Sequence, residues 1–189
     1  MTILYFDYET NGFPKKPIGN SFIQDGQARA VQLGAVLVKD NRTIAELNLI
    51  INNNVEINEH VVAVHGISKQ MCTDLGVSAK LAHDLLLELI KRADLYVSHN
   101  WAFDEKIATI ENEYLGYAPF WNYQKSFCTM EATTPLLKLP SAKGGFKWPK
   151  LTEAYQHYFG ETFDNAHDAM ADVRALRRLH KHLLANKLI

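Results

Sequence analysis

The hydrophobic and polar positions along the chain first predict a group of strands. Thr2 to Tyr8 is a continuous apolar and aromatic run, as expected of a strand that is buried on both faces. Two further runs rich in apolar residues, Ala30 to Val38 and Thr43 to Ile51, are separated by a turn-like connection short enough for an antiparallel hairpin. The first part of the chain therefore predicts a strand meander, interrupted by a long irregular loop over residues 12–29.

The rest of the chain alternates between short apolar runs and helical periodicity. Ser78 fits the N-cap position of an amphipathic helix that ends near Arg92. The elements predicted after it are a strand over Leu95–Ser98, a helix over Ala102–Leu115, a strand over Ser126–Thr129, a helix beginning at Met130, a loop over Lys138–Lys150, a helix over Thr152–Tyr158 and a long helix from about Ala166 to the end. This order predicts an α/β fold with a mixed five-stranded sheet, an antiparallel meander followed by parallel strands, flanked by helices.

Length and composition limit the function classes. With 189 residues, of which 47% are hydrophobic, the chain fits a single domain over residues 1–189 with a sizeable core. The 20 basic and 21 acidic residues give a formal net charge of −1, which excludes a basic nucleic-acid coat and an acidic disordered tail. At face value this balance also argues against a nucleic-acid partner, because phosphate binding usually accompanies a basic excess.

The two cysteines and the apolar runs bear on the compartment. Cys72 and Cys128 form no Cys-x-x-Cys pair, so we expect buried thiols rather than a disulfide framework or a zinc site. The N-terminal segment is too short and too soon acidic for a signal peptide, and no apolar run reaches the length of a membrane span. These features predict a cytoplasmic protein with no membrane partner.

Candidate chemistry begins with a pair of acids at the end of the first strand. Asp7 and Glu9 project from the same side, because side chains in a strand alternate between its faces. Two carboxylates this close repel each other unless a cation lies between them, and hard oxygen ligands suit Mg²⁺ or Mn²⁺. The alternative for Asp-x-Glu taken alone is a solvated strand end.

Further acids stand where two predicted helices begin. Asp104 follows the strand over Leu95–Ser98, at the kind of strand end where ligands gather in α/β sheets, although a helix-capping role explains it equally well. His167 and Asp172 lie on different helical stripes, and they converge only if His167 sits at the helix start. Alternatively, Asp168 and Asp172 form a solvated edge, although like charges at that spacing are mildly destabilising.

Together, these segments carry a resemblance. Phe6–Thr10, His99–Asp104 and His167–Asp172 resemble the three exonuclease motifs of the DEDD superfamily. The chain is similar to its histidine branch, DEDDh, which includes the proofreading subunit of bacterial DNA polymerase III, exonuclease X and ribonuclease T. The segment Ala63–Ser68 also matches the His-Gly-Ile segment of the proofreading-like members. The resemblance implies a ribonuclease H-like fold and a 3′-to-5′ exonuclease that releases nucleoside monophosphates.

The resemblance also implies a role for each acid. Asp7, Glu9 and Asp172 would hold one Mg²⁺ or Mn²⁺, and Asp7 would bridge to a second ion supported by Asp104. His167 would be the general base, since histidine exchanges protons near neutral pH. Two such ions can activate water, neutralise the phosphate and assist the leaving 3′ oxygen, which is two-metal-ion hydrolysis.

Substrate-binding residues follow from the same resemblance. The candidates are Thr10, Asn11 and Gly12 beside the terminal nucleotide, His65 stacked on the terminal base, and Asn100 and Phe103 in the same pocket. For His65 the alternative is a histidine packed in a turn. Two loops also mix basic and aromatic residues, a composition that suits single-stranded nucleic acid or, alternatively, a solvated loop held by a buried aromatic: Phe13, Lys15, Lys16, Phe22 and Arg29 in the first, and Lys143, Phe146, Lys147, Trp148 and Lys150 in the second.

The substrate we predict is a single-stranded or frayed DNA 3′ end. RNA 3′ ends, as for ribonuclease T, are the alternative substrate, and a non-catalytic nucleic-acid-binding subunit is the alternative from another class. The sequence is compatible with action alone, as a homodimer or beside a polymerase. If four acids serve the metal site, the near-zero net charge conceals a mildly basic surround, so nucleic-acid binding should be modest and local to the 3′ end.

Overall fold

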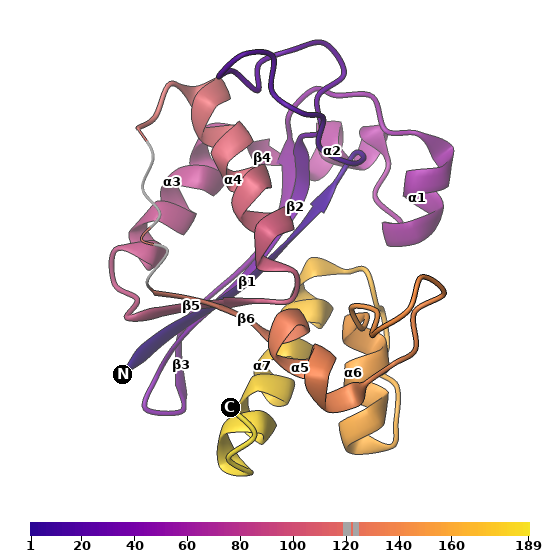
Figure 1. The fold of residues 1–189 in the computed structure, drawn as a ribbon. Coiled ribbons are helices and arrows are strands. Elements are labelled where there is room, and N and C mark those ends of the chain that lie inside the picture. Colours follow the sequence, from indigo (N-terminus) through magenta and orange to yellow (C-terminus); the bar gives the residue numbers. More distant parts are fainter. Residues whose placement is uncertain (119–121, 123–124) are drawn as a thin grey trace.

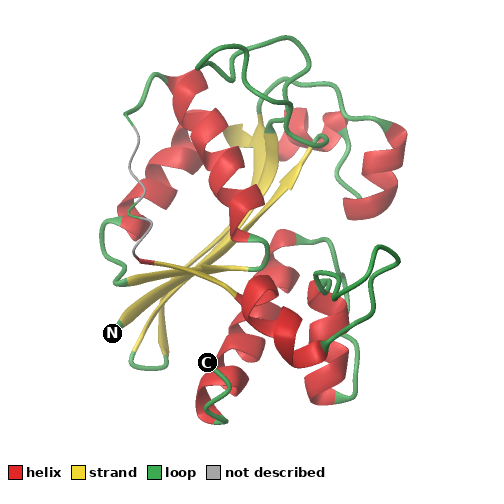
Figure 2. Cartoon of the chain, viewed as in Figure 1, coloured by secondary structure: helices red, strands yellow, loops and turns green. Residues whose placement is uncertain are grey.

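A mixed six-stranded sheet lies at the centre of the computed structural model, which describes residues 1–118, 122 and 125–189 (Figures 1 and 2). The strand order is β4-β3-β2-β1-β5-β6. The strands are β1 (Thr2–Thr10), β2 (Ala30–Lys39), β3 (Arg42–Asn52), β4 (Val77–Ser78), β5 (Leu95–Ser98) and β6 (Ser126–Cys128). Strands β1, β2 and β3 form the antiparallel meander, whereas β5 pairs parallel to β1 and β6 parallel to β5.

The sheet has one strand more than the sequence predicts. All five predicted strands are present within two residues of their expected bounds, and Leu95–Ser98 has the same bounds. The sixth, β4, is a two-residue strand that pairs parallel to the end of β3. A strand of two residues is too short to show the alternation of apolar and polar positions that identifies strands in a sequence, so β4 was not predicted.

Helices cover both faces of the sheet. Their bounds are α1 (Glu59–His65), α2 (Lys69–Leu75), α3 (Ala79–Ile90), α4 (Trp101–Leu115), α5 (Thr129–Leu137), α6 (Leu151–Phe159) and α7 (Ala169–Ala185). Helices α3 and α4 lie on one face, and α7 lies on the other beside α5 and α6 (Figure 1). The predicted cap at Ser78 is confirmed, because its side chain accepts a hydrogen bond from the backbone N–H of Leu81.

The start of the last helix differs from its prediction. Helix α7 begins at Ala169 rather than near Ala166, because His167 has left-handed backbone geometry with φ of 71°. Asp168 is the N-cap, and its Oδ1 accepts a hydrogen bond from the N–H of Ala171 at 2.9 Å. The charge of Asp168 is therefore used in capping, and the predicted alternative of a solvated edge with Asp172 is incomplete.

The alternation of β1 divides the core into two layers. Leu4, Phe6 and Tyr8 pack toward α3 and α4, whereas Tyr5 packs with α7 residues such as Met170. Asp7 and Glu9 follow Tyr5 at intervals of two, so the strand directs both carboxylates to the face that α7 covers.

Helix α7 approaches the sheet most closely at a glycine of β2. Gly34 pairs with Asp7, and a Cβ at Gly34 would lie 2.5 Å from the backbone carbonyl of Ala169. No side chain can therefore be added there without moving the helix. Gln32 holds the same turn, because its Oε1 accepts from the N–H of Ala169 at 3.0 Å and its Nε2 donates to Asp168 at 2.8 Å.

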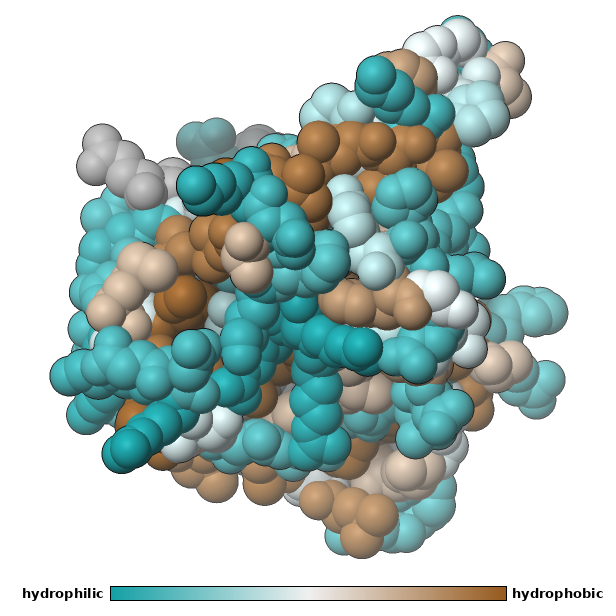
Figure 3. Space-filling view, turned by 90° about the horizontal axis from the view of Figure 1, so that it is seen from below, coloured by the Kyte–Doolittle hydropathy of each residue, from teal (hydrophilic) through white to brown (hydrophobic). Residues whose placement is uncertain are grey.

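The surface seen from below the view of Figure 1 is largely hydrophilic with scattered hydrophobic patches (Figure 3). No helix within the described ranges is both long and apolar enough to cross a bilayer. Both cysteines are free thiols. Cys72 is buried as expected, but Cys128 is only partly buried.

Candidate active site

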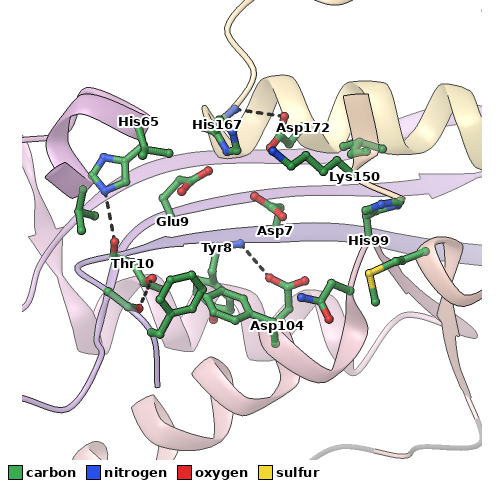
Figure 4. Close-up of a pocket in the computed structure, with 18 of the residues that line it drawn as sticks. Asp7, Tyr8, Glu9, Thr10, His65, His99, Asp104, Lys150, His167 and Asp172 are labelled. Atoms are coloured by element: carbon green, nitrogen blue, oxygen red, sulfur yellow. Dashed lines mark hydrogen bonds between the residues drawn. The ribbon is translucent and has the colours of Figure 1, made fainter. Parts of the chain in front are cut away.

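A pocket of about 620 Å³ opens where β1 and β5 end and where α4 and α7 begin. It is lined by Asp7, Tyr8, Glu9, Thr10, Gly12, Phe13, His60, Val61, Val64, His65, His99, Asn100, Phe103, Asp104, Met130, Trp148, Pro149, Lys150, Leu151, His167 and Asp172. All four acids of the predicted metal site and the predicted general base therefore line one cavity (Figure 4).

The four acids reach the pocket from three elements, β1, α4 and α7. Asp7 and Glu9 come from β1, and Figure 4 shows both carboxylates lying between that strand and the start of α7. Asp104 comes from the first turn of α4, is 1% exposed, and accepts a hydrogen bond from the N–H of Tyr8 at 3.2 Å. Its side chain is therefore tied to β1 and does not cap its own helix. Asp172 comes from the first turn of α7.

His167 and Asp172 converge through the backbone. The left-handed residue His167 directs its N–H at Oδ1 of Asp172, 3.4 Å away. Within the described residues, one group has ligand atoms that all lie within 4.8 Å of one another, and its members are Glu9, His167 and Asp172. The predicted set for one ion was Asp7, Glu9 and Asp172, so the structure brings His167 closer to the acids than that set implies.

In this pocket the ionised form of a carboxyl group is destabilised unless a cation is paired with it. Burial, reinforced by the neighbouring acids, raises the pKa of Glu9 to about 8 and that of Asp7 well above its usual range. Burial also raises the pKa values of Asp104 and Asp172. Acids that resist ionisation for these reasons are stabilised by a cation among them, and oxygen donors of this type suit a hard divalent ion.

Five of the six predicted substrate-binding residues line the pocket, namely Thr10, Gly12, His65, Asn100 and Phe103. Asn11 does not line it. Its Oδ1 accepts from the N–H of Arg29 at 2.7 Å and its Nδ2 donates to the carbonyl of Glu56 at 3.0 Å. The side chain of Asn11 is thus occupied in holding neighbouring loops to the end of β1.

The structure places His65 both in a turn and at the pocket, the two positions expected from the sequence. Its Nδ1 accepts from the N–H of Ile67 at 3.0 Å, which leaves the proton on Nε2 to donate to the carbonyl of Thr10 at 3.2 Å. Burial lowers the pKa of His65. The ring therefore packs in a turn as a neutral tautomer and also forms part of the pocket wall.

The residues of the two basic and aromatic loops have different positions in the structure: some pack within the fold and others lie at the pocket. Arg29 of the first loop pairs with Glu111 at 2.8 Å and is a largely buried structural residue, and Phe22 packs against the core. Phe13 is 89% exposed at the pocket, and the second loop contributes Trp148 and Lys150.

Other pocket residues were not predicted as site residues. His60, Val61 and Val64 belong to α1, and His99 follows β5. Two residues signal α1 in the sequence. Asn58 caps the start of the helix with its side chain, and Gly66 ends the helix with φ of 78°.

Comparisons with known proteins give a family for the chain and structures that share its fold. The sequence profile of RNase_T, described as exonuclease, matches residues 4–179. No curated protein matches the sequence significantly. Escherichia coli exonuclease I in complex with a dT13 oligonucleotide is similar in structure, with a TM-score of 0.75 and 19% identity over 96% of this chain and 40% of that chain.

Two further solved structures show the same likeness. A product-bound exonuclease I has a TM-score of 0.76 and 18% identity over 99% of this chain and 44% of that one. The zinc-bound form of an E. coli exonuclease I complex with single-stranded DNA has a TM-score of 0.74 and 20% identity, over 98% and 41% of the two chains. This chain spans about two fifths of the length of these structures.

Proposed function

Because the chain belongs to the RNase_T family of exonucleases, we propose that it removes nucleoside monophosphates from the 3′ ends of nucleic acids. Family membership and the shared fold agree with the α/β, ribonuclease H-like enzyme expected from the sequence. One observation carries the proposal: Asp7, Glu9, Asp104, His167 and Asp172 line a single pocket. We further propose that residues 1–189 act as one exonuclease domain.

The acids are proposed to hold two divalent ions, Mg²⁺ or Mn²⁺. Their fit rests on hard oxygen donors, on partial or full burial and on the raised pKa values that mutual repulsion and burial produce. Bound divalent ions would supply water activation, charge neutralisation at phosphorus and stabilisation of the leaving oxygen. The chain's contribution is to fix the donors, with Asp7 and Glu9 on the rigid strand β1 and Asp104 held by the N–H of Tyr8.

His167 is proposed to take the proton of the attacking water. Its position before the N-cap of α7 puts the ring near Glu9 and Asp172, and it is exposed enough to pass the proton to solvent. Histidine is suited to this transfer at neutral pH. Because the ring lies near Glu9 and Asp172, His167 can also serve as a ligand of a metal ion. The pH dependence of activity in His167 variants separates the general-base role from the ligand role.

The proposed substrate is single-stranded DNA. The exonuclease I structures contain dT13 and dA16 oligonucleotides, and those proteins share the fold of this chain. Near the acids the pocket is also lined by ring-bearing side chains such as His65 and Phe103, which can stack on a base without reading its identity.

The test uses 5′-labelled single-stranded DNA, duplex DNA and RNA of one sequence, each with Mg²⁺, with Mn²⁺ and with EDTA. We expect single-stranded DNA to shorten in single steps from the 3′ end, only with metal. His167→Ala and Asp7→Asn should each lose about 100-fold or more in rate. Asp164→Asn is the matched control, because Asp164 is exposed close to His167 in sequence but does not line the pocket. Internal cuts, or equal cleavage in EDTA, would contradict the proposal.

A further inference from the structure

The segment Trp148–Lys150 forms one rim of the pocket. Trp148 and Lys150 both line the cavity, with Pro149 between them. Lys150 has extended backbone geometry, with φ of −69° and ψ of 157°, and in extended chain alternate residues face the same side. Trp148 remains 67% exposed, so most of a large ring system is presented to solvent at the edge of the acidic site.

This rim is held in place by side chains of the fold. The carbonyl of Pro149 accepts a hydrogen bond from Nε2 of His99 at 3.0 Å, and Nδ1 of His99 lies 2.9 Å from the hydroxyl of Thr129. Burial lowers the pKa of His99 to about 4, so the ring is neutral and its single proton is on the nitrogen that faces Pro149. The segment is thus tied directly to the end of β5, which also leads into α4 and Asp104.

The other end of the segment is fixed by Glu153. Its Oε2 accepts from the N–H of Lys150 at 2.8 Å, and its Oε1 accepts from Nζ of Lys147 at 2.5 Å. Lys147 is therefore already paired, whereas the side chain of Lys150 extends into the pocket. A rim whose backbone is fixed at Pro149 and at Lys150 needs little ordering when it binds a ligand.

Lys150 brings a positive charge to the pocket that the acids line. In Figure 4 its side chain extends along the pocket toward Asp172. A substrate phosphate that enters the pocket is an anion with which the ammonium group can pair.

We propose that Trp148 and Lys150 bind the single strand beside the scissile bond, with Trp148 stacked on the unpaired base that precedes the terminal nucleotide and Lys150 paired with a backbone phosphate. The inference rests on the proposed exonuclease function and adds to it the two residues that would favour unpaired 3′ ends. A base in a duplex is already stacked and paired, so it reaches the ring only after fraying, whereas an unpaired base stacks without that cost.

The first experiment compares Trp148→Ala, Trp148→Phe and Phe146→Ala. Phe146 is the matched control, because it is an aromatic of the same loop, is 50% exposed and does not line the pocket. The substrates are a single-stranded 12-mer and the 4-nitrophenyl ester of thymidine 5′-phosphate, which has no neighbouring nucleotide. Trp148→Ala should lose about 5- to 150-fold in kcat/KM on the 12-mer, the range of base stacking, and far less on the ester. Trp148→Phe should recover much of the loss, and Phe146→Ala should match the parent on both substrates.

A binding measurement separates this inference from the exonuclease proposal. Titration of a dT oligonucleotide in Ca²⁺ should quench the intrinsic fluorescence, and Trp148→Phe should remove that quenching while the other tryptophans remain. If the protein quenches but cleaves nothing, the exonuclease proposal fails and the rim stands as a binding site. If the parent protein cleaves DNA and Trp148→Ala has the same kcat/KM on the 12-mer as Phe146→Ala, the proposal for the rim is overturned and the exonuclease proposal remains. Equal losses by Trp148→Ala on the 12-mer and the ester also overturn it, because they indicate a structural role.

The lysine is tested through salt dependence. For Lys150→Met the slope of log K against log[salt] for single-stranded DNA should become shallower by about 0.7, the contribution of one phosphate contact. Lys143→Met is the control, because Lys143 is an exposed cation of the same loop that does not line the pocket. A slope unchanged in Lys150→Met would overturn the phosphate contact.

Discussion

The N–H of Tyr8 donates a hydrogen bond to Oδ1 of Asp104, joining β1 to the first turn of α4 across 3.2 Å. Tyr8 is the residue between Asp7 and Glu9, so the strand that carries two acids on one face also positions a third through its backbone. Asp104 is buried, and this bond defines the orientation of its carboxylate.

Asp104→Asn should separate stability from activity. The amide oxygen can still accept from the N–H of Tyr8, while a carboxylate charge that is disfavoured by burial and by the neighbouring Asp172 is removed. In EDTA at pH 8 we expect the free energy of unfolding to rise by about 1–3 kcal/mol, and exonuclease activity in Mg²⁺ to fall about 100-fold or more. Urea denaturation and the labelled-DNA assay measure the two effects.

The paired control is Asp104→Leu, which leaves the buried N–H of Tyr8 without its acceptor and should lose about 1–3 kcal/mol relative to Asp104→Asn. A decrease in stability for Asp104→Asn in EDTA would show that repulsion at this site is negligible.

The metal-free protein should lose stability as pH rises above neutral. The pKa of Glu9 is raised to about 8 in the folded state, and those of Asp7, Asp104 and Asp172 are raised as well, whereas unfolded carboxyls titrate near 4. The folded state therefore binds more protons between these values, and its extra stability is lost as pH rises through about 8. Thermal unfolding in EDTA should show Tm falling from pH 6.5 to 8.5.

Two comparisons complete the pH experiment. Mg²⁺ should reduce the fall, because bound cations stabilise the ionised carboxylates, and Glu9→Gln should reduce it in EDTA. The window begins at pH 6.5 because burial lowers the pKa values of His99 and His180 to about 4 in the folded state, whereas unfolded histidines titrate near 6.5. Below that pH the unfolded state binds the extra protons, and these two histidines would make stability rise with pH. A Tm in EDTA that rises over this range would contradict the assigned shifts.

Asp168 should matter for stability more than for catalysis. Its Oδ1 caps α7 through the N–H of Ala171 and its Oδ2 accepts from Gln32. Asp168→Ala should cost about 1–2 kcal/mol of unfolding free energy, and Asp168→Asn should restore most of it because asparagine caps helices well. Activity at a temperature where each variant is folded should stay within a few-fold of the parent, unlike that of Asp172→Ala. A hundredfold loss in Asp168→Asn would instead give the charge a role in the reaction.

Arg29 should contribute to folding rather than to nucleic-acid binding. Its guanidinium donates to both carboxylate oxygens of Glu111 and lies 3.8 Å from the centre of the Tyr114 ring. Arg29→Met leaves the Glu111 carboxylate buried without its partner and should destabilise the protein by about 3–5 kcal/mol. Adding Glu111→Gln should recover part of the loss.

The matched control for that pair is Lys80→Met, which removes the exposed i,i+4 ion pair with Asp84 and should change stability by less than about 1 kcal/mol. Salt-dependence slopes for single-stranded DNA should be unchanged in Arg29→Met at low temperature. A shallower slope would return Arg29 to the binding surface.

Most of the sheet was predictable from sequence because β1 and β2 are largely buried and apolar, and because β3 alternates between more and less exposed positions. The alternation that places Asp7 and Glu9 on one face is a local property of β1, and the cap at Ser78 depends on residues within one turn. These features require no knowledge of distant contacts.

The sequence did not reveal two kinds of feature. One is a helix that buries few side chains, and the other is a contact between residues that lie far apart in the sequence. Helix α1 has no buried residue, and its apolar residues 61–64 are consecutive, so it lacks the periodic apolar stripe by which helices are recognised. The pairing of Arg29 with Glu111 and of Asn11 with Glu56 joins residues remote in sequence, and nothing local distinguishes these side chains from ligand-binding ones. The site residues themselves were found by motif, whereas their mutual distances came from the docking of α7 at Gly34.

That docking also has a consequence for the time at which the protein becomes active during its synthesis. β1 precedes α7 in the chain, so a nascent chain carries Asp7 and Glu9 before it carries His167 and Asp172. Under the proposed mechanism, such a chain has an incomplete ligand set and no general base. Hydrolysis can therefore begin only after α7 has been translated and has docked on the sheet.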